Sequence, residues 1–568
     1  MRNSDIRYGI KFHEDTKHSE LSVRMSIHHL DWDNRPKPFK VYVNLPLIPL
    51  PREFPQPAAD ALTSIGCMNL ERKLAAAGGD AALDIKTLAE ILFFSAGITR
   101  EIKSHSDTYY MRSASATGAL YPIELYVVCQ EIPGLRAGVY HFCPADFALS
   151  ELRAGDYRAE LAAARGGNDN ITSAPVTVVF TSIAWRNAWK YQTRSYRHWF
   201  WDAGVIAANL LATTASIALP TRLCLGFVNA EVDRLLYLDD RKEAAIALAA
   251  IGPGSADMES KTRRFSMSNR HPIAAKTANT SVAYPKTLPL SRTEIDYPEI
   301  WEMHAASSLA SGDQVRAWIE SAANKKTGQS TKGGDNILLL SRLSPREVSD
   351  DTQHRETTLG SVILSRGSTR RFARVPISFA HLSAILRTST TGVPLDFLQD
   401  EETVIDIYLI ANAVDSLRPG SYFFNRAAGC LERLERQDEV EPSSRNRSGY
   451  LCLGQSLFSD ASAVLFLMSD LQDILKALGN RGYGAAQFEA GVIAGKIYLA
   501  AYAQGIGASG STFYDDAVTE FFSPHASGKS TMIAVGVGTP AYKAHPGKIF
   551  AGRLTRTQLL SSYLSGLS

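Results

Sequence analysis

The sequence predicts an α+β protein that contains two copies of one unit. Three pairs of similar segments follow one another in the same order in the two halves of the chain. A strand–turn–strand pattern is written ELYVVCQEIPGLRAGVYHF from Glu124 and DIYLIANAVDSLRPGSYFF from Asp406. A short apolar run (APVTVVFTSI, ASAVLFLMSD) and a long alanine-rich run (DAGVIAANLLATTASIALP, EAGVIAGKIYLAAYAQGIG) come next in each half. Because the shared period is far longer than that of a solenoid repeat, we expect two duplicated domains.

Each unit predicts the same series of elements. It begins with a helix, in which Leu88 of IKTLAEILFFSAG matches Leu382 of SFAHLSAILRTSTTG. A strand follows at residues 125–129 or 407–410, and a glycine turn leads to a short second strand. The apolar run is typical of a buried strand, and the alanine-rich run is typical of a long helix.

Two segments lie outside the units. An arm at 1–80 carries polar, aromatic and proline-rich text, and a linker at 256–355 is rich in Ser, Thr, Lys and Asn with one helix-like piece, YPEIWEMHAASSLA. The predicted domains are therefore 81–255 and 356–568. A connection as long as this linker is unusual in a compact protein unless it wraps across the surface, which is where we place it.

Composition excludes several classes of protein. The 568 residues carry a formal net charge of only +2, which gives no broad electrostatic footprint for nucleic acid or a membrane. The six cysteines show no paired spacing, so neither a disulfide framework nor a metal knuckle is indicated. Since no signal-like or membrane-spanning apolar run is found, we expect a cytoplasmic protein.

Several motifs predict no site. GIGASG at Gly505 satisfies the dinucleotide pattern but follows a helix instead of a strand, and GKST at Gly528 precedes an apolar strand where a phosphate-binding loop needs a helix. Histidines in the arm have no carboxylate or cysteine at ligand spacing, so we predict no metal. These histidines are His13, His18, His28 and His29.

A basic segment in the second half suits a phosphate group. In SRGSTRRF, Arg366, Ser368 and Arg370 alternate, which places two guanidiniums and a hydroxyl on one side of an extended chain. Taken alone, an exposed basic stretch explains the pattern equally well.

The R-x-S-x-R text resembles the opening of the nitroreductase-fold flavoproteins, and RSASATGALYPIELYVV followed by GVYHF resembles their SagB-type azoline dehydrogenase branch. The resemblance implies two tandem nitroreductase-like, FMN-dependent domains that form an intramolecular pseudo-dimer. It implies that FMN is bound through its phosphate by the basic segment, and that small residues let backbone amides approach the flavin ring. The implied cofactor-binding residues are Arg366, Ser368, Arg370, Arg112, Ser113, Ser115, Gly118, Ala119, Leu120, Gly510 and Ser511.

The same branch carries a Lys-Tyr pair after the next strand, and here the pair is Lys190-Tyr191. A lysine desolvated by aromatic neighbours loses its charge more readily and can take a proton, while tyrosine can relay or donate one. The alternative is a solvated surface lysine at the mouth of a helix. The resemblance favours the catalytic interpretation. The neighbouring aromatic residues are then expected to form one wall of the flavin pocket, whereas Arg194 and Tyr196, which recur in both halves, are expected to be structural.

The halves have lost different parts of the site. Arg72-Lys-Leu-Ala-Ala76 stands where the second half has the basic segment, and Asp400-Glu-Glu-Thr-Val404 stands where the first half has GALYP. Ala477-Leu478 replaces the Lys-Tyr pair. These complementary losses predict one flavin site per chain.

Three functions remain open. The first is an FMN-dependent oxidase of azoline rings in a peptide or small heterocycle, with a cyclodehydratase as a partner. The second is an NAD(P)H-dependent nitro or quinone reductase. The third is a flavin-binding scaffold without turnover, against which the retained Lys-Tyr pair counts.

Overall fold

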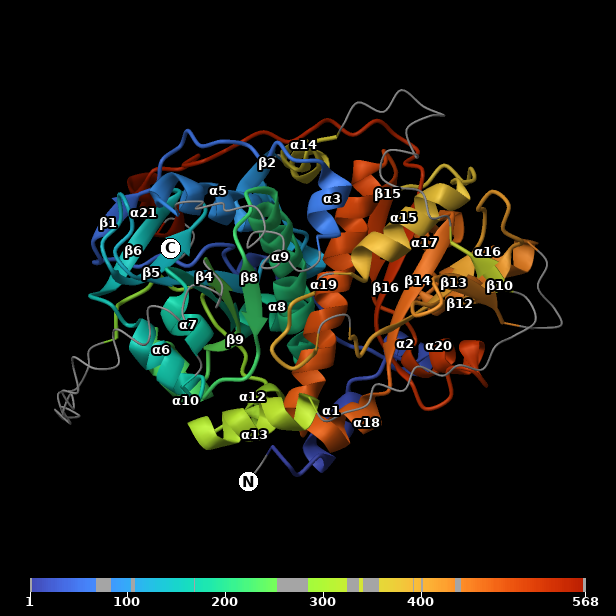
Figure 1. Ribbon diagram of the computed structural model, residues 1–568, viewed down its shortest axis with the longest axis horizontal. Helices are drawn as coiled ribbons and strands as arrows, with labels where there is room; N and C mark the ends of the chain where they lie inside the picture. Colours follow the sequence, from blue (N-terminus) through green and yellow to red (C-terminus); the bar gives the residue numbers. More distant parts are fainter. Residues whose placement is uncertain are drawn as a thin grey trace, which may run out of the picture.

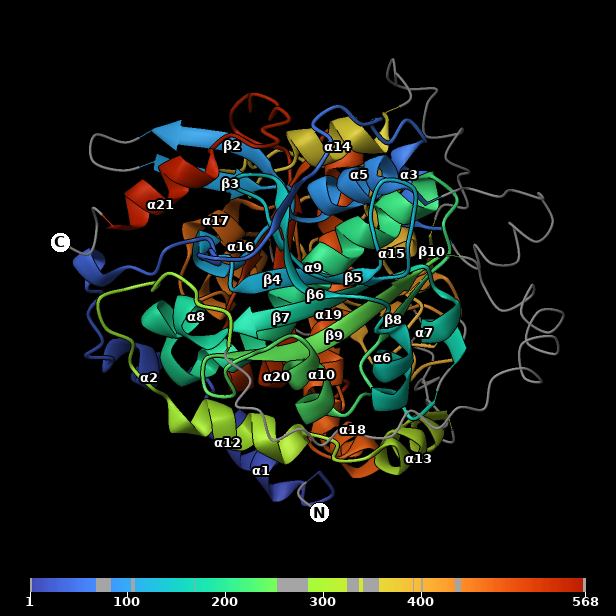
Figure 2. The ribbon, with the colours of Figure 1, turned by 90° about the vertical axis from the view of Figure 1, so that its left-hand side faces the viewer.

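The computed structural model describes residues 3–67, 83–103, 108–167, 169–252, 284–323, 337–340, 357–391, 393–399, 402–434 and 441–564. Two sheets stand on opposite sides of a pair of long helices, and the N-terminal and C-terminal arms wrap around this assembly (Figures 1 and 2).

Each half contains one seven-stranded sheet in which all neighbouring strands are antiparallel. The strand orders correspond element for element, which confirms the duplication and the α+β fold class. In order across the first sheet the strands are β1 (Leu47–Pro49), β6 (Ala148–Ala154), β5 (Gly138–Cys143), β4 (Ile123–Cys129), β7 (Val176–Ile183), β9 (Glu243–Ile251) and β8 (Thr221–Cys224). In the second sheet they are β10 (Ile337–Leu339), β13 (Cys430–Arg433), β12 (Gly420–Asn425), β11 (Asp406–Ala411), β14 (Ala463–Ser469), β16 (Ser530–Gly538) and β15 (Gly507–Ser511).

The helices also recur in pairs. In the first half they are α5 (Ile85–Ala96), η2 (Thr117–Ala119), α6 (Arg158–Ala164), α7 (Asp169–Ser173), α8 (Ala184–Tyr191), η3 (Gln192–Arg194), α9 (Ser195–Ser216) and α10 (Asn229–Leu235). In the second they are α14 (Leu359–Ser365), α15 (Phe379–Ser389), α16 (Glu441–Leu451), α17 (Ser456–Asp460), α18 (Leu471–Leu478), α19 (Arg481–Ala503) and α20 (Asp515–Phe522). A two-stranded ribbon, β2 (Ile98–Lys103) with β3 (Thr108–Arg112), belongs to the first half alone among the described residues.

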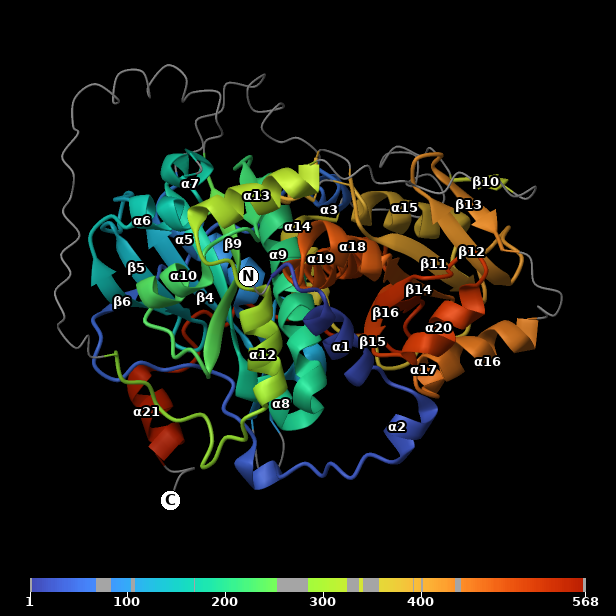
Figure 3. The same ribbon diagram turned by 90° about the horizontal axis from the view of Figure 1, so that it is seen from below.

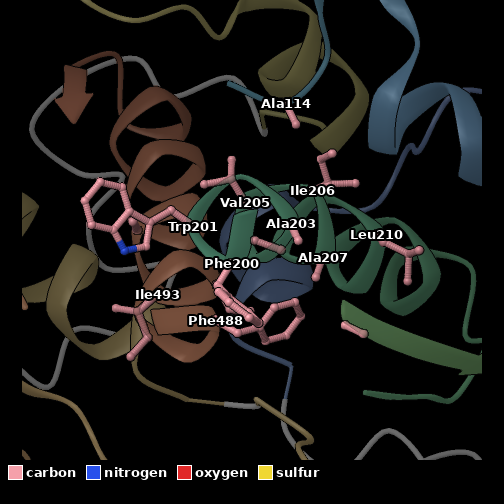
Figure 4. Packing of buried hydrophobic residues seen from close by; sticks show 14 of the residues in the cluster. Ala114, Phe200, Trp201, Ala203, Val205, Ile206, Ala207, Leu210, Phe488 and Ile493 are labelled. Atoms are coloured by element: carbon pink, nitrogen blue, oxygen red, sulfur yellow. The ribbon is translucent and has the colours of Figure 1, made fainter. Parts of the chain in front are cut away.

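The two long helices α9 and α19 form the contact between the halves. They cross at glycines that stand at matching places in the repeat, Gly204 and Gly491. A Cβ atom on Gly204 would lie 2.5 Å from the carbonyl oxygen of Phe488, and one on Gly491 would lie 2.6 Å from the carbonyl oxygen of Trp201. Figure 4 shows the apolar side chains around this crossing, with Phe200 beside Phe488. The shared "AG" text is therefore required because the two backbones touch.

Reciprocal arginine contacts strengthen this pseudo-dimer. Arg194 forms a buried ion pair with Asp515 at the start of α20, and Arg481 donates to the side chain of Asn229 at the start of α10. The predicted structural role of Arg194 thus agrees with its position. Tyr196 is fully buried, and its ring meets Phe12 of the arm at a centroid distance of 5.4 Å.

The arm and the linker contribute strands to the two sheets as well as covering the surface. β1 in the arm and β10 in the linker are the edge strands of the two sheets, so both sheets extend beyond the predicted domain boundaries. Three-residue strands carry too little periodicity to be recognised in proline- or polar-rich text. The helices of these segments are α1 (Arg7–Asp15), α2 (Glu20–Arg24), η1 (Trp32–Asn34), α3 (Ala61–Ile65), α12 (Pro298–Ser307) and α13 (Gly312–Ala323), and α21 (Arg556–Leu564) follows near the C-terminus.

The motifs set aside in the sequence lie where they were expected. GIGASG joins the end of α19 to β15, and GKST is a turn, with Gly528 at φ 82°, that leads into β16. Within the described ranges no helix is both long and apolar enough to cross a bilayer.

Candidate active site

The small-residue segment of the first half is a strained turn. Gly118, Ala119 and Tyr121 have φ values of 64°, 53° and 51°, which only glycine adopts without cost. A Cβ atom on Gly118 would lie 2.6 Å from the hydroxyl oxygen of Tyr191. Glycine is therefore required here for two reasons, and the turn and the Lys-Tyr pair are in direct contact.

A buried carboxylate holds this turn. Asp202 of α9 accepts hydrogen bonds of 2.8 Å from both the backbone nitrogen and the hydroxyl of Thr117. The amide of Asn187 lies 3.4 Å from its other oxygen. Burial raises the pKa of Asp202 to about 7, although these donors oppose the shift. A small cavity beside the carboxylate is lined by Ser115 among others, so Ser115 lies at the turn as predicted.

The second half retains the same arrangement. Glu489, which matches Asp202 in the repeat, accepts hydrogen bonds from the hydroxyl of Thr403 and the backbone nitrogen of Val404. Burial raises its pKa to about 7 as well. The sequence reasoning assigned Asp202 no role, although the repeated D/E-A-G text was a signal that could have identified it.

Lys190 and Tyr191 end α8 and face the turn. Both side chains are half-buried. The ring of Tyr191 meets that of His198 edge-on at 4.6 Å, and His198 in turn lies 4.8 Å from Trp201. These rings contact one another in a row, and their predicted role as a wall of the flavin pocket stays a prediction.

Trp199 is a correction to that wall. It packs 5.6 Å from Trp301 and 5.9 Å from His304 of α12, a helix of the linker. Successive residues of a helix point in directions about 100° apart, so the neighbours His198 and Trp199 cannot line the same surface. The unusual aromatic content of α9 serves two contacts, one toward Tyr191 and one toward the linker.

The electrostatic surroundings of Lys190 are cationic. Within the described ranges its ammonium group has neither a hydrogen bond nor an ion pair. Burial lowers its pKa, and the charges of Arg35 in the arm and Arg370 in the second half lower it further. A lysine in this position is more easily neutral than an exposed one and can accept a proton.

Arg366 joins the two halves through backbone oxygens. Its guanidinium donates to the carbonyl of Ser113 at 2.8 Å and to that of Arg112 at 2.9 Å, and its own burial lowers its pKa. Asn209 of α9 donates to the same carbonyl of Ser113. The predicted phosphate contact of Arg366 stays a prediction, but two of its donors already hold the ring-edge segment in place.

The two guanidiniums of the basic segment do not share one side, as an extended strand would require. Arg366 is buried, whereas Arg370 is exposed and only its backbone nitrogen is bonded, to the hydroxyl of Tyr542 at 3.1 Å. The segment is irregular, so strand alternation does not apply to it.

Two tyrosines of α19 position the basic segment against β15. The hydroxyl of Tyr498 accepts a hydrogen bond from the backbone nitrogen of Gly510 and lies 3.4 Å from the hydroxyl of Ser368. One turn later, the hydroxyl of Tyr502 lies 3.3 Å from that of Thr369. Sequence reasoning missed both tyrosines, since a tyrosine in an apolar helix is ordinarily part of the core.

The remaining predicted residues are placed as follows. The guanidinium of Arg112 donates to the carbonyls of Pro38 and Ile123, and its predicted contact with the cofactor stays a prediction. Leu120 is buried in the core. The hydroxyl of Ser113 is buried without a partner among the described residues, and that of Ser511 accepts from the amide of Gln455 at 2.9 Å.

The repeat relates the loop between β15 and α20 in the second half to the loop between β8 and α10 in the first. At the first-half loop, a side chain of the protein itself bonds the backbone amides. Asp396 accepts hydrogen bonds of 2.9 Å from the backbone nitrogens of both Leu225 and Gly226, and it forms a buried ion pair with Arg165. Leu223 of β8 exchanges backbone hydrogen bonds with the same segment. Asp396 is thus an internal anion that satisfies two amides at the end of an edge strand.

The matching amides in the other half belong to Ser511 and Thr512. Ser511 ends β15 and Thr512 follows it, and the two precede α20 by the same number of residues as Leu225 and Gly226 precede α10. In the part of the chain that the structure describes, the backbone nitrogen of Thr512 has no acceptor. A group with hydrogen-bond acceptors fits there.

These observations favour one ligand position per chain. The number of flavins bound per chain stays a prediction. Ala477-Leu478 lies at the end of α18, where Lys190-Tyr191 ends α8. The compared segment 72–76 and the acidic residues 400–401 lie outside the described residues.

FMN fits the residues around the loop that joins β15 to α20, which we call the open position. An exposed guanidinium at Arg370 and the hydroxyl of Ser368 suit a phosphate, and the free amide of Thr512 and the backbone at Gly118 suit the polar edge of a flat ring. When bound, FMN would supply a two-electron acceptor at this place.

A model of the nitroreductase family matches residues 73–253 and 363–539, which is more than half of the chain. The chain belongs to the nitroreductase family. It is accordingly an oxidoreductase, and each matched region contains one of the two sheets except for its edge strand, β1 or β10.

Three curated relatives were found. A putative nitroreductase of Methanocaldococcus jannaschii is 26% identical over 30% of this chain and 81% of its own length. The microcin B17-processing protein McbC of Escherichia coli is 26% identical over 25% of this chain, and the trifolitoxin-processing protein TfxB of Rhizobium leguminosarum bv. trifolii is 30% identical over 29% of it. The matches span 53% and 46%, about half, of the two processing proteins.

Among solved structures, a putative nitroreductase from Anabaena variabilis superimposes with a TM-score of 0.69 over 94% of this chain and 99% of its own, at 24% identity. This likeness confirms the nitroreductase fold across both halves. The nitroreductase-like flavoprotein fold inferred from the sequence is therefore correct.

Proposed function

We propose that this nitroreductase-family chain is an FMN-dependent oxidase that converts azoline rings, thiazoline or oxazoline, into azoles. One observation carries the proposal: the turn at Gly118 touches Tyr191 of the Lys-Tyr pair, and the carbonyls of the ring-edge segment just before it are bonded by Arg366 of the other half. The Lys-Tyr pair, the small-residue turn and the basic segment are far apart in sequence, yet they meet in one place.

The residues of the site divide the work of an oxidation. Forming an azole from an azoline removes a proton from the α-carbon in the ring and a hydride from the ring carbon next to it. Lys190, whose pKa is lowered by burial and by two arginines, takes the proton at Nζ. Bound FMN would supply the two-electron acceptor, and dioxygen, reduced to hydrogen peroxide, would be the final oxidant. Tyr191, whose pKa is raised by burial, keeps its proton and presents a hydroxyl next to Gly118.

Cofactor binding is divided between the halves. Arg370 and Ser368 bind the phosphate, and Arg366 contributes through the ring-edge backbone that it holds. The amides at Ser511 and Thr512 approach the polar edge of the flavin, as Asp396 approaches their counterparts. Asp202 keeps the turn at Gly118 in its strained conformation by bonding Thr117.

The names of the curated relatives favour a peptide substrate. McbC and TfxB are described as processing proteins for microcin B17 and trifolitoxin. We infer that this chain acts in the cytoplasm on a ribosomal peptide or a related heterocycle, next to a cyclodehydratase that forms the azoline.

The test begins with the purified protein. Its visible absorbance should show flavin, and the extracted cofactor should be FMN at about one per chain. A ratio of two would contradict the single site, and a colourless protein would contradict the proposal. Bleaching of the flavin by NADH or NADPH alone would favour the reductase alternative.

The base is tested by Lys190→Ala. The variant should keep its flavin and lose azoline oxidation by at least about a hundredfold, the usual contribution of a positioned base. Lys476→Ala, at the end of the matching helix α18, is the control and should oxidise normally. Normal turnover by Lys190→Ala would refute the role of Lys190.

A further inference from the structure

The N-terminal arm runs between the two edges of the candidate active site. At one end, the backbone nitrogen of Asp515 donates to the carbonyl of His18 at 3.0 Å, and that of His18 donates to the carboxylate at 2.8 Å. At the other end, the ring of His28 lies 3.0 Å from the carbonyl of Trp189, and the indole of Trp189 donates to the carbonyl of Asp31. Figure 3 shows this part of the chain, in blue, curving from α2 back to η1 beside α8.

Both anchors adjoin residues of the site. Asp515 follows the Ser511 loop closely, and Trp189 directly precedes Lys190. Arg35, just after η1, is near enough to lower the pKa of Lys190. The arm between these anchors therefore borders the candidate active site, and we call it the rim.

This rim exposes large apolar side chains. Leu21, Met25, Ile27 and Trp32 are 67%, 70%, 88% and 61% exposed. Leu21 lies on α2, one turn before Met25, so the two share a side of the helix. No residue of α2 is buried. Surface apolar residues scattered singly need no explanation, but four within one short segment beside the candidate active site indicate a binding surface.

The rim adjoins one of the two pseudo-symmetric positions. Its anchors reach the end of β15 and the end of α8, both parts of the open position. The matching amides at the end of β8 are instead bonded by Asp396. The arm therefore belongs to the site that retains Lys190.

We propose that arm residues 19–32 bind the apolar residues flanking the reacting ring in a polypeptide substrate. This inference rests on the proposed function and selects a peptide over a small heterocycle. A small heterocycle is held at the reacting residues alone, whereas a peptide extends beyond them along the neighbouring surface. Because the exposed side chains of the rim are apolar, the flanking residues that they contact are apolar as well.

The test compares a long and a short substrate with the holoprotein. The variant is Leu21→Ser/Met25→Ser/Ile27→Ser, which leaves Trp32 packed edge-on against Trp189 at a centroid distance of 5.3 Å. The control, Ile295→Ser/Leu339→Ser, removes apolar side chains that are 57% and 73% exposed elsewhere. The long probe is a 15-residue peptide with one thiazoline between leucine and valine residues, and the short probe is a capped single thiazoline.

With the long probe, the triple variant should raise KM about tenfold or more with kcat unchanged, since each lost apolar contact weakens binding severalfold. The short probe and the control variant should show no change. Equal effects on both probes, or none on the long one, would overturn the proposal.

Binding of the thiazole form of the long peptide, measured by fluorescence anisotropy, separates this inference from the proposed oxidation. It should weaken about tenfold in the triple variant alone. If binding behaves so but no thiazoline is oxidised, the proposed function fails and the rim stands. If the unmodified protein does not bind this peptide, the rim proposal fails even where the short probe is oxidised. A self-association, or binding to phosphatidylglycerol vesicles, that the triple substitution abolishes would also overturn it.

Discussion

Lys496 is a buried lysine whose effect on the free energy of unfolding can be predicted from its pKa. It occupies on α19 the place that Asn209 occupies on α9, and it is 2% exposed. Its ammonium group donates to the carbonyl of Thr391, and no carboxylate pairs with it among the described residues. Burial lowers its pKa from 10.5 to about 7. A buried lysine without a counter-ion should destabilise the fold.

The magnitude follows from linkage. Because the folded-state pKa lies below the unfolded one, the unfolded chain binds the extra proton between pH 7 and pH 10.5, and stability rises with pH across that window. A shift of this size costs about 5 kcal/mol at pH 6 and about 2 kcal/mol at pH 9. Lys496→Met removes that cost and loses a hydrogen bond worth about 1 kcal/mol.

The assay is urea unfolding followed by tryptophan fluorescence at the two pH values. The stabilisation of Lys496→Met over the unsubstituted protein should be about 2.5 kcal/mol larger at pH 6 than at pH 9. The lost hydrogen bond and the changed packing cancel in this difference. The control is Lys476→Met, whose side chain is 62% exposed, and it should show no such pH dependence. An equal gain at both pH values would refute the reasoning, because Lys496 would then remain charged when folded.

Three further outcomes are expected. Asp202→Ala should release the strained turn and lower FMN affinity by about tenfold or more, as measured by flavin retention on dialysis. Glu489→Ala is the control and should lower stability without changing flavin content. Equal flavin loss in both variants would contradict the role of Asp202. Arg366→Gln should lower both the flavin content and the unfolding midpoint, because it frees two buried carbonyls, and a change in neither would contradict its bridging position. Gly491→Leu should lower the unfolding midpoint by several degrees or prevent folding, because its side chain would meet the backbone at Trp201; a midpoint equal to that of the unsubstituted protein in calorimetry would contradict the close crossing.

Much of the fold was predictable because duplication repeats its own evidence. Matching strands and alanine-rich helices in both halves gave the correct fold class, and each element had a second copy to check it. The predicted domain boundaries were too narrow, since β1 and β10 complete the two sheets from within the arm and the linker. Such short edge strands form only because a longer strand offers free backbone groups beside them.

For the site, sequence identified segments better than side-chain roles. The Lys190-Tyr191 pair, the Gly118 turn and the basic segment do meet, but Arg112 and Arg366 have guanidiniums bonded to carbonyls. Tyr498 could not be identified from the sequence, because its hydrogen bond to Gly510 depends on which strand packs beside α19.

The amino-acid sequence by itself determined the duplication, the nitroreductase-like fold and the segments from which a single site could be built. These properties are local patterns that neighbouring residues carry, or comparisons between two copies in one chain. Only the tertiary structure decided that Asp202 holds the turn, that Asp396 closes the opposite position, and that the arm forms a rim beside Lys190. Each of these depends on contacts between residues far apart in the chain, and the chain's path through space brings them together.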